Sequence, residues 1–266
     1  SNRSVDIRHQ EEDYGDTTNS YSIITGGSSG IGLATAKALA AQKRNLILVA
    51  RNEEKLLAAK KSIQESADID VKKFAVDLQD MDAIEKFYGE VSSLDIDIVI
   101  NNAGLALGKA SFEDYDFKDF EGMIDTNIKG FLKVAQLAMP HLKKHKGHIV
   151  NLSSIAGVEA YEGGSVYCAS KAFVKMISRN LRIDLAGTGV RVTDIAPGAV
   201  ETDFSNTRFK GDTAVAESVY KGYAPLQPED IADCIAFAVS RPVHVNIDYM
   251  LVMPTAQASA TRLVKN

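Results

Sequence analysis

Tyr167 and Lys171 stand four residues apart in the segment SVYCASK. On an α-helix, side chains four residues apart lie on one face, so a phenol and an ammonium can share one site. An unperturbed phenol has a pKa of about 10, and a neighbouring cation favours its ionised form. Tyr167 could therefore accept the proton of an alcohol while hydride leaves for a bound nicotinamide, and return it in the reverse direction. By itself the pair is weak evidence, because amphipathic helices also place such pairs on their surfaces by chance.

The segments around this pair alternate between short apolar runs rich in β-formers and longer runs of helical period. The apolar runs are YSIIT, LILVA, VKKFAV, DIVIN, GHIVNLSS, VRVTDIA and YMLVM, and the helical runs include GIGLATAKALAAQ, EEKLLAAKKSIQES and DAIEKFYGEVSSL. This alternation predicts an α/β fold of the Rossmann type, a doubly wound parallel sheet with helices on both faces. No Pro/Gly/Ser-rich linker interrupts it, so residues 20–266 are expected to form a single domain. Residues 1–19 are polar and acidic, which predicts a flexible tail.

A glycine-rich turn, TGGSSGIG, joins the first apolar run to the first helical run. Glycines there let the chain turn tightly and let backbone N–H groups approach a pyrophosphate at the positive end of a helix. The spacing Gly26-x-x-x-Gly30-x-Gly32 differs from the G-x-G-x-x-G fingerprint of dinucleotide-binding proteins. On this motif alone, an ordinary strand-to-helix turn rich in Gly and Ser remains the alternative.

The second apolar run ends where an NAD enzyme places an acid for the ribose 2′-OH, about 20 residues past the glycines. Ala50 and Arg51 stand there instead. A carboxylate would repel a 2′-phosphate, whereas a guanidinium can bind it bidentately, so NADP is favoured over NAD. The alternative is a solvated arginine paired with Glu53 or Glu54, and the preceding glycine turn favours the cofactor role.

Composition excludes several other classes of protein. Hydrophobic residues make up 45% of the 266 residues, charged residues 24%, and the net charge is −5, so no basic field attracts nucleic acid. No apolar run reaches the length of a membrane span and no signal peptide is evident, so we expect a cytoplasmic protein without a membrane partner. The cysteines, Cys168 and Cys234, form no CxxC pattern, and the lysine-rich PHLKKHKGH segment reads as a helix C-terminus rather than a metal site.

Taken together, these motifs give the chain a family resemblance. From about residue 20 to 256 it resembles the short-chain dehydrogenase/reductase family, in which the glycine spacing seen here is the usual one. The matching motifs are TGGSSGIG (25–32), Asp77-Leu78, NNAG (101–104), Asn127, Ser153-Ser154, Y-x-x-x-K (167–171) and Pro197-Gly198.

The resemblance implies a catalytic tetrad of Asn127, Ser154, Tyr167 and Lys171. Ser154 would bind the substrate oxygen, Lys171 would also bind the nicotinamide ribose, and Asn127 would hold a water that passes protons to solvent. The cofactor NADP would be lined by Gly26, Ser28, Ser29, Gly30, Ile31, Gly32, Arg51, Asp77, Leu78, Asn102, Ala103, Gly104, Tyr167, Lys171, Pro197, Gly198, Val200 and Thr202. The domain of residues 20–266 would then be a dinucleotide-binding catalytic domain.

A narrower likeness lies in the C-terminal third, where ETDFSNTRFKGD and the segment from 223 to 259 resemble NADP-dependent 3-hydroxy acid dehydrogenases. Those enzymes oxidise the 3-hydroxyl of small hydroxy acids or amino acids. In the family, the segment at about 199–222 forms a lid over the substrate. Its Arg208 and Lys210 would suit a carboxylate, and with Ser154 and Tyr167 they form the expected substrate site. Alternatively, the two cations are solvated loop charges that balance Asp203 and Asp212.

Two other functions stay open at this point. The first is a carbonyl reductase for sugars, steroids or other ketones, for which Leu105, Leu107, Val158 and Tyr161 offer apolar surface. The second is a protein that senses NADP without catalysis, and the intact catalytic motif argues against it. The segments 120–144 and 167–187 carry long apolar faces, and in this family the corresponding pair of helices forms the dimer interface. The resemblance therefore implies a homotetramer.

Overall fold

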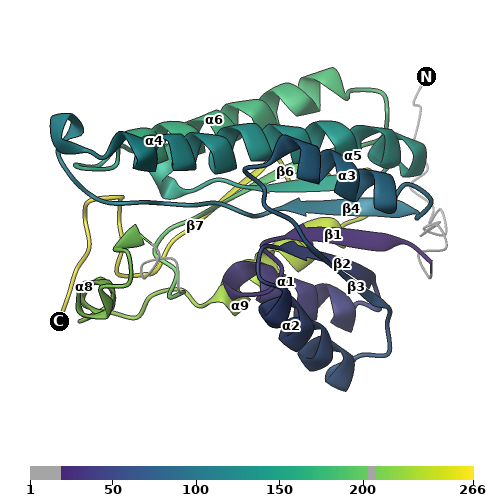
Figure 1. Ribbon diagram of the computed structural model, residues 1–266, viewed down its shortest axis with the longest axis horizontal. Helices are drawn as coiled ribbons and strands as arrows, with labels where there is room; N and C mark the ends of the chain where they lie inside the picture. The colour runs from purple at the N-terminus through teal and green to yellow at the C-terminus, as the bar shows by residue number, and fades with distance from the viewer. Residues whose placement is uncertain (1–18, 203–207) are drawn as a thin grey trace, which may run out of the picture.

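Seven parallel strands form one sheet in the computed structural model, which describes residues 19–202 and 208–266 (Figure 1). The strands are β1 (Tyr21–Thr25), β2 (Asn45–Ala50), β3 (Val71–Ala75), β4 (Ile96–Asn101), β5 (His148–Leu152), β6 (Arg191–Pro197) and β7 (Tyr249–Val252). Their order across the sheet is β3-β2-β1-β4-β5-β6-β7. The order reverses between β1 and β4, and in open α/β sheets the crevice at such a point is where ligands bind.

Helices cover both faces of the sheet. The helices and short turns are α1 (Gly30–Ala41), α2 (Glu53–Ser66), α3 (Met81–Glu90), η1 (Phe112–Asp114), α4 (Phe117–Ile124), η2 (Asp125–Gly130), α5 (Phe131–His145), η3 (Ile155–Gly157), α6 (Ser165–Asp184), α8 (Thr213–Ser218) and α9 (Pro228–Val239). In Figure 1, α3, α4, α5 and α6 lie above the sheet, and α1, α2 and α9 lie below it. The Rossmann-type doubly wound fold predicted from the sequence is therefore confirmed.

The strands are buried on both faces because helices pack on both. Four consecutive residues of β2, Leu46 to Val49, are buried. Every residue of β5 is buried, including the polar His148 and Asn151. Ile23 and Ile47 belong to the core on the α5 side, while Ile24, the neighbour of Ile23, belongs to the core on the α9 side. Continuous apolar runs such as LILVA are typical of strands in this environment.

One predicted helix departs from regular geometry. The segment 120–144 was expected as one continuous helix, but a π-helical turn, η2, separates α4 from α5 and contains Asn127. A Cβ at Gly130, the last residue of the turn, would overlap the carbonyl oxygen of Leu78. The turn therefore passes directly against the loop that follows β3. Single π turns inserted in α-helices occur frequently at functional sites.

Two predicted segments fall partly outside the described residues. Residues 1–18 of the predicted tail and residues 203–207 of the predicted lid are among those the structure does not describe. Within the described residues, no helix is long and apolar enough to cross a membrane. The domain boundaries and the cytoplasmic location stay predictions.

Candidate active site

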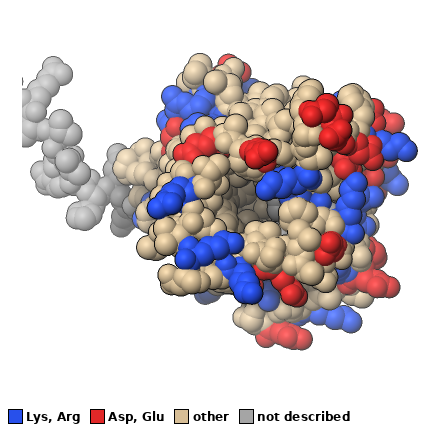
Figure 2. Space-filling view, turned by 90° about the vertical axis from the view of Figure 1, so that its left-hand side faces the viewer, with Lys and Arg blue, Asp and Glu red and all other residues tan. Residues whose placement is uncertain are grey.

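The loops that follow β1, β4, β5 and β6 meet at one edge of the sheet, because parallel strands all end at the same edge. Viewed from this side, the surface is hollowed, with lysine and arginine side chains at the rim of the hollow and uncharged residues around it (Figure 2). The motifs singled out in the sequence lie on these loops and on the helices that begin beside them.

In the glycine turn, the backbone at Gly32 packs directly against the backbone at Gly26. Gly26 and Gly30 have φ angles of 63° and 52°, a region that favours glycine. A Cβ at Gly32 would overlap the Gly26 carbonyl oxygen and lie 2.9 Å from Nδ2 of Asn102. Ser29 is the N-cap of α1 and makes no side-chain capping bond, so its side chain leaves the first N–H groups of the helix to a ligand. Ser28 and Ile31 flank these positions.

Thr25 joins the glycine turn to the NNAG turn after β4. Its hydroxyl oxygen accepts the N–H groups of Asn102 and Ala103 at 2.9 and 3.0 Å, and Asn102 Nδ2 donates to the Thr25 carbonyl at 3.0 Å. The two turns therefore form one rigid unit. A cradle of backbone N–H groups with no room for side chains is the surface that a pyrophosphate requires.

Beyond this cradle, just after β2 and β3, Arg51 and Asp77 face each other. The Arg51 guanidinium lies 3.9 Å from the Asp77 carboxylate, and its side chain is 72% exposed. This loose, exposed pair leaves the guanidinium accessible to a phosphate. Leu78 is buried beside the η2 turn.

Tyr167 and Lys171 both lie on the buried face of α6, with exposed fractions of 9% and 6%. The Lys171 ammonium donates to the Leu152 carbonyl at 3.0 Å and lies 5.9 Å from the centroid of the Tyr167 ring. Burial lowers the pKa of Lys171 to about 8. Burial raises the pKa of Tyr167, and a hydrogen bond with Ser154 and the charge of Arg208 oppose that rise. The pair predicted from spacing is therefore held together in a poorly solvated site.

Asn127 connects this pair to the NNAG turn. Its Oδ1 accepts the Leu105 N–H at 2.8 Å, and its Nδ2 donates to the Leu105 carbonyl at 2.7 Å and to Ser170 at 3.1 Å. A Cβ at Gly104 would lie 3.1 Å from Lys171 Nζ and 3.7 Å from Asn127 Oδ1. Glycine at this position keeps the ammonium and the amide side by side.

Ser154 ends the loop after β5 and faces the same space. Its oxygen accepts the Ala156 N–H at 3.0 Å and its hydroxyl lies 3.5 Å from the Pro197 carbonyl. Ser153, its neighbour, is 4% exposed and is directed into the protein. The structure thus brings together all four predicted tetrad residues, with Ser154 rather than Ser153 next to Tyr167.

The segment after β6 returns toward the glycine turn. Gly198 donates its N–H to the Val252 carbonyl at 2.7 Å, and Val200 forms a bridge with Leu226. The Thr202 side chain approaches Gly30, because a Cβ there would lie 3.6 Å from Thr202 Cγ2. Pro197 to Thr202 therefore cross over the space between the glycine turn and Tyr167.

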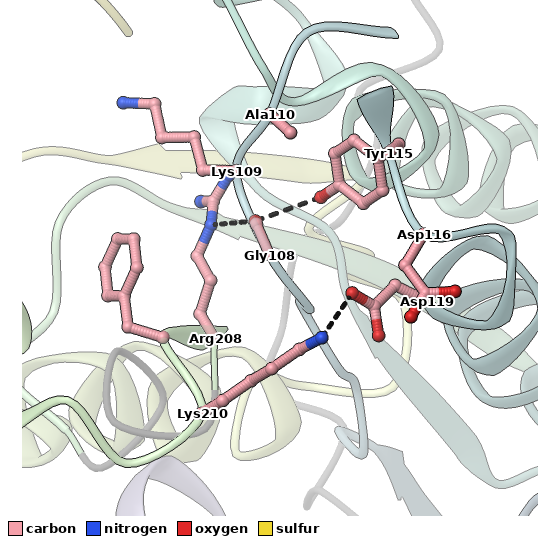
Figure 3. A pocket seen from close by; sticks show the side chains of 9 residues that line it. Gly108, Lys109, Ala110, Tyr115, Asp116, Asp119, Arg208 and Lys210 are labelled. Carbon is pink, nitrogen blue, oxygen red and sulfur yellow. Dashed lines mark hydrogen bonds and ion pairs between the residues drawn. The ribbon is translucent and has the colours of Figure 1, made fainter. Parts of the chain in front are cut away.

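Arg208 extends from the segment after β6 toward Gly108 (Figure 3). Its Nη1 donates to the Tyr161 hydroxyl at 2.7 Å and its Nε donates to the Gly108 carbonyl at 3.2 Å. The centre of the guanidinium lies 5.9 Å from the centroid of the Tyr167 ring. A permanent cation thus stands beside the phenol, and the Arg208 main chain is fixed by the Gly108 N–H at 2.8 Å.

Lys210 is engaged differently. Its ammonium lies 2.8 Å from the carboxylate of Asp119, a residue that is largely buried (Figure 3). The contact with Asp119 raises the pKa of Lys210. The two residues line the same cavity of about 320 Å³ together with Gly108, Lys109, Ala110, Tyr115, Asp116, Arg208 and Phe209. The role of Lys210 in substrate binding stays a prediction, and in this structure its charge is already paired.

Several residues of the site carried no signal in the sequence. Gly108 and Asp119 hold the predicted lid through contacts that span up to 100 residues. Tyr161, named from the sequence only for its apolar surface, accepts a hydrogen bond from Arg208. Tyr115 donates its hydroxyl to the carbonyls of Leu107 and Gly108 and so fixes the loop that receives Arg208. The described residues contain no cluster of three or more His, Cys, Asp or Glu side chains suited to a metal ion.

Comparison with known proteins agrees with this geometry. The family model described as short chain dehydrogenase matches residues 21–213. The chain is 42% identical over 240 residues to "Sulfoacetaldehyde reductase 2" of Chromohalobacter salexigens, covering 89% of this chain and 94% of the relative. It is 41% identical over 240 residues to "Serine 3-dehydrogenase" of Agrobacterium fabrum, with coverage of 90% and 95%. It is 39% identical over 242 residues to "NADP-dependent 3-hydroxy acid dehydrogenase YdfG" of Escherichia coli K12, with coverage of 90% and 96%.

A solved structure shows the same fold. The closed form of serine dehydrogenase complexed with NADP+ superposes with a TM-score of 0.85 at 38% identity, covering 92% of this chain and 99% of that chain. The chain belongs to the short-chain dehydrogenase family.

Proposed function

We propose that this protein is an oxidoreductase that transfers a hydride between NADP and the 3-hydroxyl or 3-oxo group of a small hydroxy acid or amino acid. The observation that carries the substrate class is the Arg208 guanidinium, which lies beside the Tyr167 ring at the inner wall of the site. The relatives named as a serine 3-dehydrogenase and a 3-hydroxy acid dehydrogenase support the same class. A half-buried arginine next to the reacting group suits a substrate that carries a negative charge close to its hydroxyl.

The glycine turn fits NADP in shape and in charge. The backbone cradle at Gly26, Gly30 and Gly32 would hold the pyrophosphate, and Arg51 would bind the 2′-phosphate. Asp77 and Leu78 would flank the adenine, and the NNAG turn and Pro197 to Thr202 would line the remainder. When bound, the oxidised cofactor supplies a hydride acceptor.

The proton is handled by the tetrad. Tyr167 would accept the proton of the substrate hydroxyl as the C–H hydride departs, and would return it when the carbonyl is reduced. Lys171, charged below about pH 8, would stabilise the phenolate that forms. Ser154 would hold the substrate oxygen through a hydrogen bond, and Asn127 would hold a water that passes protons to solvent.

A second candidate is the reduction of a small sulfonated aldehyde, favoured by the relative named as a sulfoacetaldehyde reductase. A sulfonate and a carboxylate both present oxygen atoms that share a negative charge. Arg208 could bind either through the same charge-assisted hydrogen bonds. Uncharged ketones, sugars and steroids would make no use of this cation.

The variant Arg208→Gln tests the anionic substrate. The loss of one charge-assisted interaction should raise KM for 3-hydroxy acids by about tenfold to 100-fold, with a smaller change in kcat. For uncharged secondary alcohols the loss of kcat/KM should be smaller, because it would come only from the lost charge beside the Tyr167 phenol. Initial rates of NADPH formation measure both quantities.

Arg241→Gln is the matched control, because Arg241 stacks on Phe237 of α9 outside the site. It should leave both substrate classes unaffected. An equal loss of activity toward charged and uncharged substrates in Arg208→Gln would mean that Arg208 acts on the lid or on Tyr167 without binding the anion.

We also propose a homotetramer built through the outer faces of α5 and α6. Met176 and Ile183, seven residues apart on α6, are 65% and 70% exposed, and Leu132 on α5 is 39% exposed. Exposed apolar side chains that align along a helix are typical of an interface. Light scattering on the purified protein should give the mass of four chains, and the mass of a single chain would contradict this assembly.

A further inference from the structure

Asp194 is a buried carboxylate that has no part in the tetrad. It lies in the middle of β6 with only 2% of its surface exposed. A buried acid is costly to keep ionised unless charges or hydrogen bonds compensate it. Among the described residues, no ammonium or guanidinium lies within 4.0 Å of its side chain, so it has no direct ion pair.

The side chains around Asp194 come from both neighbouring strands and from the helix above them. In the sheet its partners are Asn151 on β5 and Tyr249 on β7. Helix α6 packs on β6 and carries Lys171 and Lys175, one turn apart. The Lys175 ammonium lies over the Tyr249 ring, 3.9 Å from its centroid.

Lys171 is placed close to Asp194 by the register of the sheet. Its ammonium donates to the carbonyl of Leu152, and Leu152 pairs with Ile195, the residue that follows Asp194. Ser153, next to Leu152, donates its N–H to the Ile195 carbonyl at 2.9 Å. The Lys171 ammonium is thus held against the end of β5, beside the stretch of β6 that carries Asp194.

The charges of the two groups affect each other. Burial raises the pKa of Asp194, whereas the adjacent Ser153 and the charges of Lys175 and Lys171 oppose this rise. For Lys171 the balance is reversed, because burial lowers its pKa to about 8 and Asp194 opposes that fall. Burial, Tyr161, Ser154, Arg208 and Cys168 affect the pKa of Tyr167 most. An effect of Asp194 on Tyr167 would pass through the Lys171 ammonium, which lies 5.9 Å from the centroid of the Tyr167 ring.

We propose that Asp194 is the buried counter-charge of Lys171, a positioning residue that keeps the ammonium protonated beside Tyr167. Its catalytic consequence rests on the proposed function, in which the ammonium stabilises the Tyr167 phenolate. The charge coupling itself does not depend on any reaction. It predicts that a neutral side chain at position 194 weakens the positive charge at the site.

The test is Asp194→Asn, which removes the charge and keeps the shape. Nuclear magnetic resonance of the full-length protein with isotope-labelled lysine follows the Lys171 ammonium through a pH titration, with Lys171→Arg to assign its signal. The pKa of Lys171 should fall by about one pH unit relative to the unchanged protein. An unaltered Lys171 titration would overturn the proposal, whatever the activity of the variant.

The pH dependence of turnover gives the second readout. In Asp194→Asn the half-rise of kcat for alcohol oxidation should move to higher pH, with kcat near neutral pH about tenfold lower and KM little changed. A purely structural role would instead lower activity by the same factor at every pH. A shifted Lys171 titration with an unmoved pH profile would refute the positioning role.

Asp248→Asn is the control, because Asp248 precedes β7 and its carboxylate pairs with Arg179 and Arg182 at 2.7 and 3.2 Å. It should alter neither the Lys171 titration nor the pH profile. If Asp194→Asn does not fold, Asp194→Ser is a smaller neutral replacement with the same expected shifts. Loss of turnover in Tyr167→Phe is independent of Asp194, so it separates a failure of this inference from a failure of the proposed function.

Discussion

Tyr167→Phe should lower kcat for hydroxy-acid oxidation by about 10³-fold, because it removes the phenol proposed to accept the substrate proton. The ring of Tyr167 packs against a buried cluster that includes Phe120 and Met123, and phenylalanine preserves that packing. The affinity for NADP+ should therefore stay within about threefold of the original value. Initial rates give kcat, and quenching of protein fluorescence gives the cofactor Kd.

The matched control is Tyr88→Phe. Tyr88 is also buried, and its hydroxyl donates to the Val134 carbonyl at 2.8 Å, far from the site in the core beneath α5. This variant should lose about 1 kcal/mol of stability and keep its kcat. If Tyr167→Phe retained more than a tenth of the original kcat, the phenol would not be the proton acceptor.

The second large effect is expected at the glycine turn. Gly32→Ala should lower the free energy of unfolding by at least about 3 kcal/mol and weaken NADP+ binding by at least about tenfold. Its φ is not positive, so the effect would come from overlap of the new Cβ with the Gly26 carbonyl and with Asn102. To relieve this overlap, either the glycine turn would move, which would disrupt the cradle, or α1 would separate from the turn. Denaturant unfolding and cofactor titration measure the two quantities.

Gly89→Ala is the control for a methyl group added to a helical glycine. A Cβ at Gly89 in α3 would meet nothing within 4 Å. Because alanine is the better helix former, this variant should be more stable by about 0.5–1 kcal/mol and bind NADP+ normally. Equal behaviour of the two variants would show that the contact between the glycine turn and the NNAG turn is not essential.

The fold could be predicted from the sequence because its signals are local and repeated. LILVA and the segment EEKLLAAKKSIQES have the periods of a buried strand and an amphipathic helix, and such units recur along the chain. Tyr167 and Lys171 could be paired because a helix places residues four apart on one face. Gly26, Gly30 and Gly32 could be recognised because only glycine tolerates the conformation or the space at these positions.

The remaining features depend on contacts that no local pattern encodes. The π-helical turn that places Asn127 looks like ordinary helix in the sequence. Arg208 and Lys210 could be named as cations, but their different partners, Tyr161 and Asp119, become visible only when distant loops meet. Asp194 reads as one polar residue in a strand, and its proposed relation to Lys171 depends on the pairing of β5 with β6 and on the contact of Lys171 with Leu152.

One measurement tests the central claim most directly: initial rates of the unchanged protein with a panel of alcohols. With NADP+, the account predicts that L-serine, L-allo-threonine, 3-hydroxypropionate or 3-hydroxyisobutyrate is oxidised with kcat/KM at least about tenfold above that of uncharged secondary alcohols. It also predicts weaker activity with NAD+, since Arg51 would bind the 2′-phosphate. Faster turnover of every uncharged alcohol than of any acid, or a preference for NAD+, would contradict it.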